Sequence, residues 1–248
     1  YSGGTTVGAG TLRGNTTSLQ GEIDNDSNVV FDQAGVGTYS GNMTGVGSLT
    51  KQNVGTLILS GTNSYSGGTT VTGGTLQGST ASLQGDITND AEVVFDQTVS
   101  GTYSGNMEGT GTLTKQGAGT LILTGTNSYS GGTTVCAGTL RSDATSLQGD
   151  VSNNAAVVFD QPVDGTYAGD ITGTGTLTKL GAGTLTLSGA NSYGGGTTVT
   201  WGTLEGNTTS LQGDIANDAV VVFDQPIAGT YSGDMSGTGS LSKQGAGT

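Results

Sequence analysis

Short runs of β-branched, aromatic or alternating apolar residues fill the chain, and glycine, asparagine and aspartate separate one run from the next. In the second quarter of the chain these runs cover residues 69–71, 75–77, 82–87, 93–97, 102–107, 112–115 and 120–124. Runs of this length and composition predict short β-strands joined by tight turns. No window has useful helical periodicity, and each glycine would cost a helix about 1 kcal/mol. The pattern therefore predicts an all-β protein.

The same pattern recurs with a constant period, without insertion or deletion. A tyrosine followed by Ser/Gly-Gly-Gly-Thr-Thr-Val opens each copy, at Tyr1, Tyr65, Tyr129 and Tyr193. Two further aromatic sets keep this spacing, and they are Phe31, Phe95, Phe159 and Phe223, and Tyr39, Tyr103, Tyr167 and Tyr231. Strict spacing predicts that each copy packs on the next in one geometry. We therefore expect a single continuous solenoid over residues 1–248, with copies at 1–64, 65–128, 129–192 and 193–248, the last of them truncated.

Short strands and tight glycine or asparagine corners favour a right-handed parallel β-helix, or β-solenoid. A copy of 64 residues would form about three coils and rise about 14 Å at the usual strand spacing. The last copy stops inside a Gly-Ala-Gly-Thr segment that runs on into a strand in the earlier copies. We expect a longer array, with any export signal or anchor outside this sequence.

About half of each copy resembles the passenger-associated repeat of bacterial autotransporters. The resemblance rests on the segment from Gly111 to Val135 and the Gly-Thr-Leu that ends at Leu140, and it recurs from Gly47 to Leu76 and from Gly175 to Leu204. It implies a β-helical passenger that is exported through an outer-membrane barrel and is displayed on the cell surface or released. The half between Ser-Leu-Gln-Gly and Phe-Asp-Gln lies outside that motif.

Composition and charge narrow the range of functions that this chain can have. Glycine occupies 49 positions and apolar residues make up 31%, which leaves only a thin core. A net charge of −13 repels phosphate backbones and anionic lipid, so we expect no nucleic-acid partner and no membrane-surface binding. No apolar run approaches the roughly 20 residues of a membrane span, so we expect no membrane insertion of this segment. The lone Cys136 excludes an intramolecular disulfide.

Repeated acidic residues are the first candidates for chemistry, because some parallel β-helices cleave polysaccharides with clustered acids. One set ends a strand in every copy, at Asp32, Asp96, Asp160 and Asp224. If equivalent residues lie three coils apart, about 14 Å separates them, whereas paired catalytic carboxylates need roughly 5 to 10 Å. Pairs within one copy, such as Asp24 with Asp26 or Asp86 with Asp90, change between copies. We therefore interpret these acids as solvated turn residues.

The sequence assigns no catalytic residue, no metal ligand and no cofactor. The Gly-Gly-x-Gly-x-Asp nonapeptide of calcium-binding β-rolls is missing, and Arg13 and Arg141 occur in only two copies. The lysine that recurs at Lys51, Lys115, Lys179 and Lys243 is expected to form an ion pair or to face water. The sequence therefore predicts a protein that is not an enzyme.

Other recurrent residues favour structural roles. We expect an asparagine to hold a corner and to satisfy backbone groups between coils, at Asn25, Asn89, Asn153 and Asn217 and at Asn63, Asn127 and Asn191. The tyrosine and phenylalanine sets fit core packing better than a sugar-stacking platform. Alternation places Cys136 outward, and we interpret Cys136 and Trp201 as drift within the repeat.

Three functions remain open. The first is a structural and adhesive stalk or fibre-forming segment of a secreted or surface-displayed bacterial protein, acting in adhesion, autoaggregation or an extracellular scaffold. The second is the non-catalytic part of an extracellular polysaccharide-degrading enzyme, and the third is a carbohydrate-binding module. The expected partners are neighbouring repeats, further copies associating end to end or side by side into fibres, and a host or bacterial surface glycan or protein.

Overall fold

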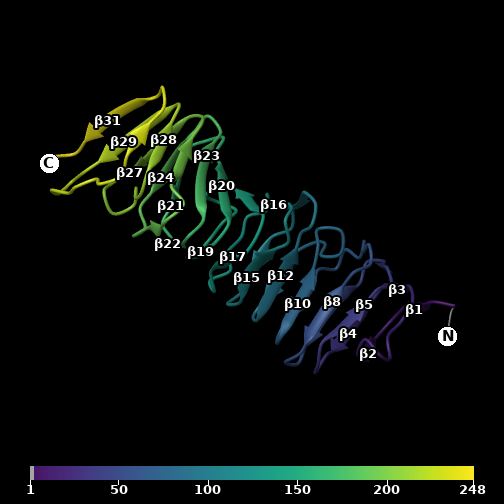
Figure 1. Cartoon of the computed structure of the whole chain (residues 1–248). Helices are drawn as coiled ribbons and strands as arrows, with labels where there is room; N and C mark the ends of the chain where they lie inside the picture. Colours follow the sequence, from purple (N-terminus) through teal and green to yellow (C-terminus); the bar gives the residue numbers. More distant parts are fainter. Residues whose placement is uncertain (1–2) are drawn as a thin grey trace. The chain divides into compact units, whose positions relative to one another are not determined.

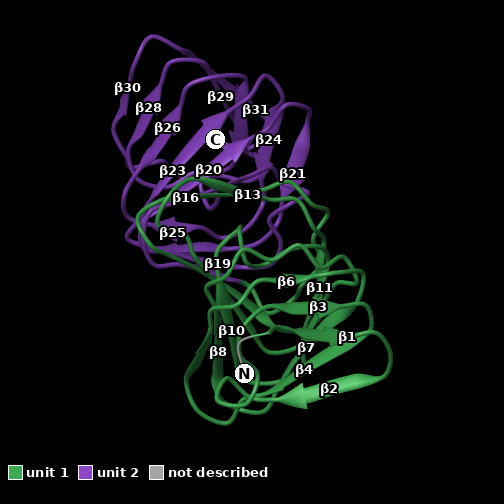
Figure 2. Ribbon diagram, turned by 90° about the vertical axis from the view of Figure 1, so that its right-hand side faces the viewer, with its two compact units in different colours: residues 1–132 green, residues 133–248 purple. Residues whose placement is uncertain are grey.

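A computed structural model describes residues 3–248, and these residues form parallel β-strands stacked as a β-solenoid without a helix. The chain divides into two compact units, residues 1–132 and 133–248, which Figure 2 shows in separate colours. Tyr1, the first tyrosine of the repeated set, lies outside the described residues. The expected fold class, a parallel β-helix built from 64-residue copies, is confirmed.

The first unit contains sixteen strands among its described residues. They are β1 (Thr5–Val7), β2 (Thr11–Gly14), β3 (Ile23–Asn25), β4 (Asn28–Asp32), β5 (Gly37–Tyr39), β6 (Met43–Thr44), β7 (Ser48–Gln52), β8 (Thr56–Leu59), β9 (Thr69–Val71), β10 (Thr75–Gly78), β11 (Ile87–Asn89), β12 (Glu92–Asp96), β13 (Gly101–Tyr103), β14 (Met107–Glu108), β15 (Thr112–Gln116) and β16 (Thr120–Leu123). Their parallel ladders run β2-β4-β7-β9-β11-β14, β5-β8-β10-β12-β15, β1-β3-β6 and β13-β16. The strands of the second of these ladders are labelled in Figure 1.

The second unit repeats this arrangement. Its strands are β17 (Thr133–Val135), β18 (Thr139–Ser142), β19 (Val151–Asn153), β20 (Ala156–Asp160), β21 (Gly165–Tyr167), β22 (Ile171–Gly173), β23 (Thr176–Leu180), β24 (Thr184–Leu187), β25 (Ser192–Tyr193), β26 (Thr197–Val199), β27 (Thr203–Gly206), β28 (Ile215–Asn217), β29 (Val220–Asp224), β30 (Met235–Ser236) and β31 (Ser240–Gln244). Its ladders run β17-β19-β22-β25, β18-β20-β23-β26-β28-β30 and β21-β24-β27-β29-β31.

Two of the strands expected in the second copy differ in the structure. The segment from Ser82 to Ile87 becomes a strand only at β11, because residues 80–82 form a turn in which the Ser82 and Leu83 amides donate to the Ser79 carbonyl at 3.0 and 2.9 Å. The segment from Thr102 to Met107 divides into β13 and β14. At Gly105, between them, a Cβ would lie 2.0 Å from the Gly85 carbonyl oxygen, so only glycine allows the coils to approach at this bend.

The register shows that one copy is longer than three coils. In the β2-β4-β7-β9 ladder, Arg13 pairs with Val30, Val30 with Thr50 and Thr50 with Thr70. Three coils therefore lead from β2 to β9, although β10 is the strand that repeats the sequence of β2. The chain must continue from β9 to β10, along one further face of the coil, before the sequence of β2 recurs. Each copy therefore spans three coils and one face.

Equivalent residues consequently do not lie above one another. The Thr-Thr-Val strand is paired with β3 in the first copy, as β1, and with β7 and β11 in the second copy, as β9. In the second unit β17 and β26 also belong to different ladders. The expectation that equivalent acids are separated by three whole coils was wrong, because each copy begins one face further round the coil.

The core is a set of columns along the coil axis, since parallel pairing in register places inward side chains above one another. Phe31, Lys51, Val71 and Asn89 form one such column in the first unit, and Phe159, Lys179, Val199 and Asn217 form the same column in the second. The phenylalanines and their tyrosine partners pack as tilted pairs, with ring centroids 5.0 to 5.2 Å apart. The aromatic sets therefore belong to the core, as expected, apart from the last pair, whose Tyr231 is only partly covered.

The recurrent asparagines hold corners, as the sequence predicts. Asn153 is fully buried; its Nδ2 donates to the Thr176 carbonyl at 2.9 Å and its Oδ1 accepts from the Ala155 amide at 3.2 Å. Thr176 belongs to the next coil, so one side chain satisfies backbone groups in two coils. Asn191 acts in the same way, with its Oδ1 accepting from the Ile171 amide and its Nδ2 donating to the Ser210 carbonyl.

We predict that Asn153→Asp lowers the free energy of unfolding by about 1–3 kcal/mol, because a carboxylate cannot donate to the Thr176 carbonyl and places a buried charge beside it. Asn154→Asp is a matched control, since the next residue is exposed and three other copies carry aspartate there, at Asp26, Asp90 and Asp218. Urea denaturation followed by circular dichroism measures both variants. Equal denaturation midpoints for the two variants would show that this corner contact does not stabilise the fold.

Candidate functional site

The recurrent lysine is buried at a corner of the coil. Lys51, Lys115 and Lys179 are fully buried, although the sequence suggested an ion pair or a water-facing side chain. The Lys179 ammonium donates to the carbonyls of Leu180, Gly181 and Trp201 at 2.7, 2.8 and 3.0 Å. The expectation was therefore wrong, and alternation carried the missed signal, because each lysine stands two residues after a buried leucine, as Lys179 does after Leu177.

This arrangement, the lysine corner, consists of a buried lysine and the carbonyls of the turn that follows it. At Lys51 the acceptors are Gln52, Asn53 and, from the next coil, Gly73, at 3.1, 2.8 and 2.7 Å. Asn53 has a φ of 70°, and its equivalent Gly181 has 77°. This left-handed conformation turns the carbonyl inward to the ammonium, and it explains the glycine at this position in the other copies.

Burial lowers the pKa of Lys51 to about 8, and it lowers the pKa of Lys179 as well, while the nearby Asp32 and Asp160 raise the two values in part. A lysine with a lowered pKa can act as a base or a nucleophile. Here the amine is enclosed between a phenylalanine and a valine of the core column, and its donors are directed at backbone carbonyls. The geometry therefore fits a link between two coils better than a reactive amine.

The pKa values of two tyrosine hydroxyls in the core are also shifted. Burial raises the pKa of Tyr65 to about 12, although the Thr69 hydroxyl at 2.7 Å lowers it in part. Burial has the same effect on Tyr193, whose pKa is about 12. Both hydroxyls are thus held neutral and hydrogen-bonded inside the coil, where they serve the packing of the core.

The candidate acids bind backbone amides of the next coil. Asp150 Oδ1 accepts from the Asp170 amide at 2.9 Å, and Asp170 Oδ1 accepts in turn from the Ala190 amide at 2.6 Å. Asp26 and Asp90 likewise accept from the amides of Val46 and Thr110 at 3.3 and 3.2 Å, whereas Asp24 accepts from the Thr44 hydroxyl and Asp86 from the Asn106 amide. Through these hydrogen bonds the acids connect one coil to the next.

The strand-end acids divide between two environments. Asp32 pairs with Arg13, and hydrogen bonds from that guanidinium hold the pKa of the carboxyl below its usual value. Asp160 pairs with Arg141. Asp32 and its equivalent Asp96 lie in β4 and β12, which belong to different ladders. Within residues 3–248, Asp96 has no arginine partner and accepts instead from Gln77 Nε2 at 3.2 Å.

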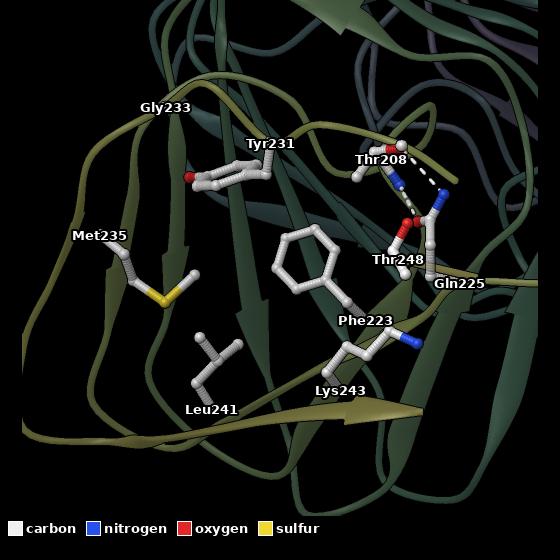
Figure 3. A pocket seen from close by; sticks show the side chains of 10 residues that line it. Thr208, Phe223, Gln225, Tyr231, Gly233, Met235, Leu241, Lys243 and Thr248 are labelled. Carbon is white, nitrogen blue, oxygen red and sulfur yellow. Dashed lines mark hydrogen bonds between the residues drawn. The ribbon is translucent and has the colours of Figure 1, made fainter. Parts of the chain in front are cut away.

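A pocket of about 340 Å³ opens at the last coil of the second unit. Figure 3 shows Phe223, Tyr231, Met235, Leu241 and Lys243 around it. The equivalents of these residues one copy earlier are all buried, and they are Phe159, Tyr167, Ile171, Leu177 and Lys179. The pocket therefore has the composition of a cross-section through the core. At its edge, Gln225 Nε2 donates a hydrogen bond to the Thr208 hydroxyl at 3.1 Å.

Three further features concern residues 3–248. Nowhere in this part of the chain do three or more His, Cys, Asp or Glu side chains come together as metal ligands. No helix there has the length and hydropathy needed to cross a membrane. Cys136 is exposed, as alternation predicts.

Comparison with known proteins agrees with the repeats and the coil geometry. The family model described as the passenger-associated-transport-repeat matches residues 1–13, 49–77, 113–141 and 177–205. The chain is a repeat segment of an autotransporter passenger domain. Three of the four matched ranges begin at the inward leucine before a buried lysine, so the lysine corner is part of the repeat.

A curated relative of this passenger segment is the adhesin BmaC autotransporter of Brucella suis biovar 1 (strain 1330). The two are 37% identical over 250 residues, and the match covers 77% of this chain. The chain spans about 7% of the length of that adhesin. No solved structure matches the chain. The passenger segment is thus adhesin-like by its repeats and its relative.

We predict that Lys179→Met destabilises the passenger segment by about 1–3 kcal/mol, because three inward carbonyls lose their donor while the apolar packing is kept. Lys243→Met is the matched control, since Lys243 is exposed and its Nζ donates to the Gly245 carbonyl. Denaturation midpoints of the two variants are compared with that of the unmodified chain. A Lys179→Met variant as stable as Lys243→Met would contradict a stabilising role for the ammonium.

Proposed function

We propose that this segment is a non-catalytic adhesive stalk of a bacterial passenger that is displayed on the cell surface or secreted. The observation that carries the proposal is the use of the polar side chains. The turn acids, corner asparagines and buried lysines are engaged in hydrogen bonds from one coil to the next. In such a segment the polar side chains stabilise the stack of coils, and the outer surface is available for contact with a partner.

The similarity to an autotransporter adhesin supports the adhesive part of this proposal. The stack supports the mechanical part, since the coils within each unit are bonded to their neighbours and stability accumulates coil by coil. Attachment to surfaces and aggregation of cells are both within the proposal, because a repeated surface multiplies weak contacts.

Deletion of residues 1–248 from the parent protein tests this function. Cells that display the parent or the deletion at equal surface levels, verified with an epitope tag, are compared for attachment and for cell-to-cell aggregation. We expect the deletion to lower attachment, and we expect the purified 248-residue chain to compete with attachment of the parent. Unchanged attachment and no competition at equal display would contradict an adhesive role for this segment.

A further inference from the structure

The exposed large apolar side chains gather at one kind of corner. Eight such residues are exposed within the described part of the chain, and six of them lie at the turn that follows a recurrent lysine or at the turn of a coil directly below or above it. These six are Val36, Val54, Val99, Val163, Trp201 and Ile227. In an exterior dominated by glycine, threonine and acids, this clustering marks a surface rather than scattered residues.

The second unit has the fullest example, and we call Pro162, Val163, Ala182 and Trp201 its apolar corner. They lie on three successive coils: a Cβ at Gly183 would come 2.3 Å from the Val163 backbone, and one at Gly202 would approach the Ala182 backbone at 2.9 Å. Glycine above Val163 leaves that side chain 69% exposed, and Trp201 is 66% exposed. Both residues therefore offer their apolar surface to a partner.

The backbone beneath the apolar corner is satisfied from inside the coil. The Val163 carbonyl accepts from Gln161 Nε2 at 2.8 Å, and the Gly181 and Trp201 carbonyls accept from the Lys179 ammonium. Covering a polar group that has no partner is costly, but these acceptors already have theirs. A partner can therefore exclude water from this corner without leaving those carbonyls unpaired.

Charge decides which partner fits. Among the described residues three lysines are buried and both arginines are paired with aspartates, which leaves Lys243 as the one exposed base without a carboxylate partner. The exterior is thus more acidic than the net charge of −13 suggests. Asp164 is exposed at the apolar corner itself, whereas Asp160, which ends the strand before it, is already paired with Arg141. A second copy of this acidic chain would be repelled, whereas a basic surface would be attracted.

We propose that the apolar corner of the second unit binds polypeptides in which an apolar side chain is flanked by lysine or arginine. The apolar group covers Val163 and Trp201, and the bases face Asp164. The proposal rests on the adhesive function above and names the chemistry of the surface that the segment contacts.

The test is binding of a short fluorescently labelled peptide of leucine and lysine to the full 248-residue chain, measured by anisotropy. Two variants remove the apolar corner and use residues that other copies carry at the same positions: Trp201→Ala, as in Ala9, and Val163→Gly, as in Gly35. Asp164→Ala, as in Ala228, removes the flanking charge. We expect the double variant Trp201→Ala/Val163→Gly to weaken binding at least about tenfold, as for a central anchor, and Asp164→Ala to weaken it in low salt.

Control peptides separate this corner from general attraction to an acidic chain. Replacement of leucine by serine, or of lysine by glutamate, is expected to abolish binding. Equal binding of the serine peptide, or no effect of the double variant, would overturn the proposal in favour of unspecific attraction. Concentration-dependent association of the chain with itself that the double variant abolishes would show that a second copy is the occupant. Loss of peptide binding in the double variant with unchanged cell attachment would overturn the link to adhesion and leave the adhesive role of the segment intact.

Discussion

The backbone hydrogen bonds between successive coils are the constraint on which the rest of this structure depends. A parallel ladder satisfies the strands, but each coil must also turn corners, and the carbonyls at those corners point inward where no strand can meet them. In this passenger segment the inward donors are side chains: Lys179 at one corner, Asn153 and Asn191 at the others. The core therefore contains apolar columns together with lysine and asparagine side chains that bind the corner carbonyls. A core this thin depends on both for its stability.

The lysine corner connects this constraint to the outer surface. Because the ammonium and the glutamine amide of the coil below draw carbonyls inward, the outer sides of these turns are free to carry valine, isoleucine or tryptophan. The acids have the complementary role, since Asp150 and Asp170 face outward and still bind amides of the next coil. The result is an acidic exterior in which apolar side chains recur at one kind of corner.

Much of the fold could be predicted from the sequence because it depends on local alternation and strict spacing. Alternation found most strands, the aromatic core, the outward Cys136 and the corner asparagines. Alternation also places the Lys51 side chain inward, because Lys51 stands two residues after the inward Leu49. The prediction failed there because lysines are generally expected to be exposed. The turn at residues 80–82 was missed because Ser and Ala give no strong turn signal there, and the closure depends on hydrogen bonds to Ser79.

The displacement of each copy by one face could not be predicted in this way either. It follows from coils that are shorter than a third of a 64-residue copy, since Thr11 lies opposite Asn28 and Asn28 lies opposite Ser48, and each length depends on how far a corner turns before its strand meets the next coil.

Disulfide formation tests this register most directly. In a Cys136→Thr background, which copies the threonine of Thr72 and Thr200, cysteines at Thr50 and Thr70 lie opposite each other in adjacent parallel strands. Strands about 4.8 Å apart fit disulfide geometry, so we predict that the Thr50→Cys/Thr70→Cys pair closes under mild oxidation. The Thr50→Cys/Thr72→Cys pair, two residues out of register, should stay reduced. Closure of the second pair instead of the first would contradict the pairing of β7 with β9 in this register and, with it, the rotation of successive copies.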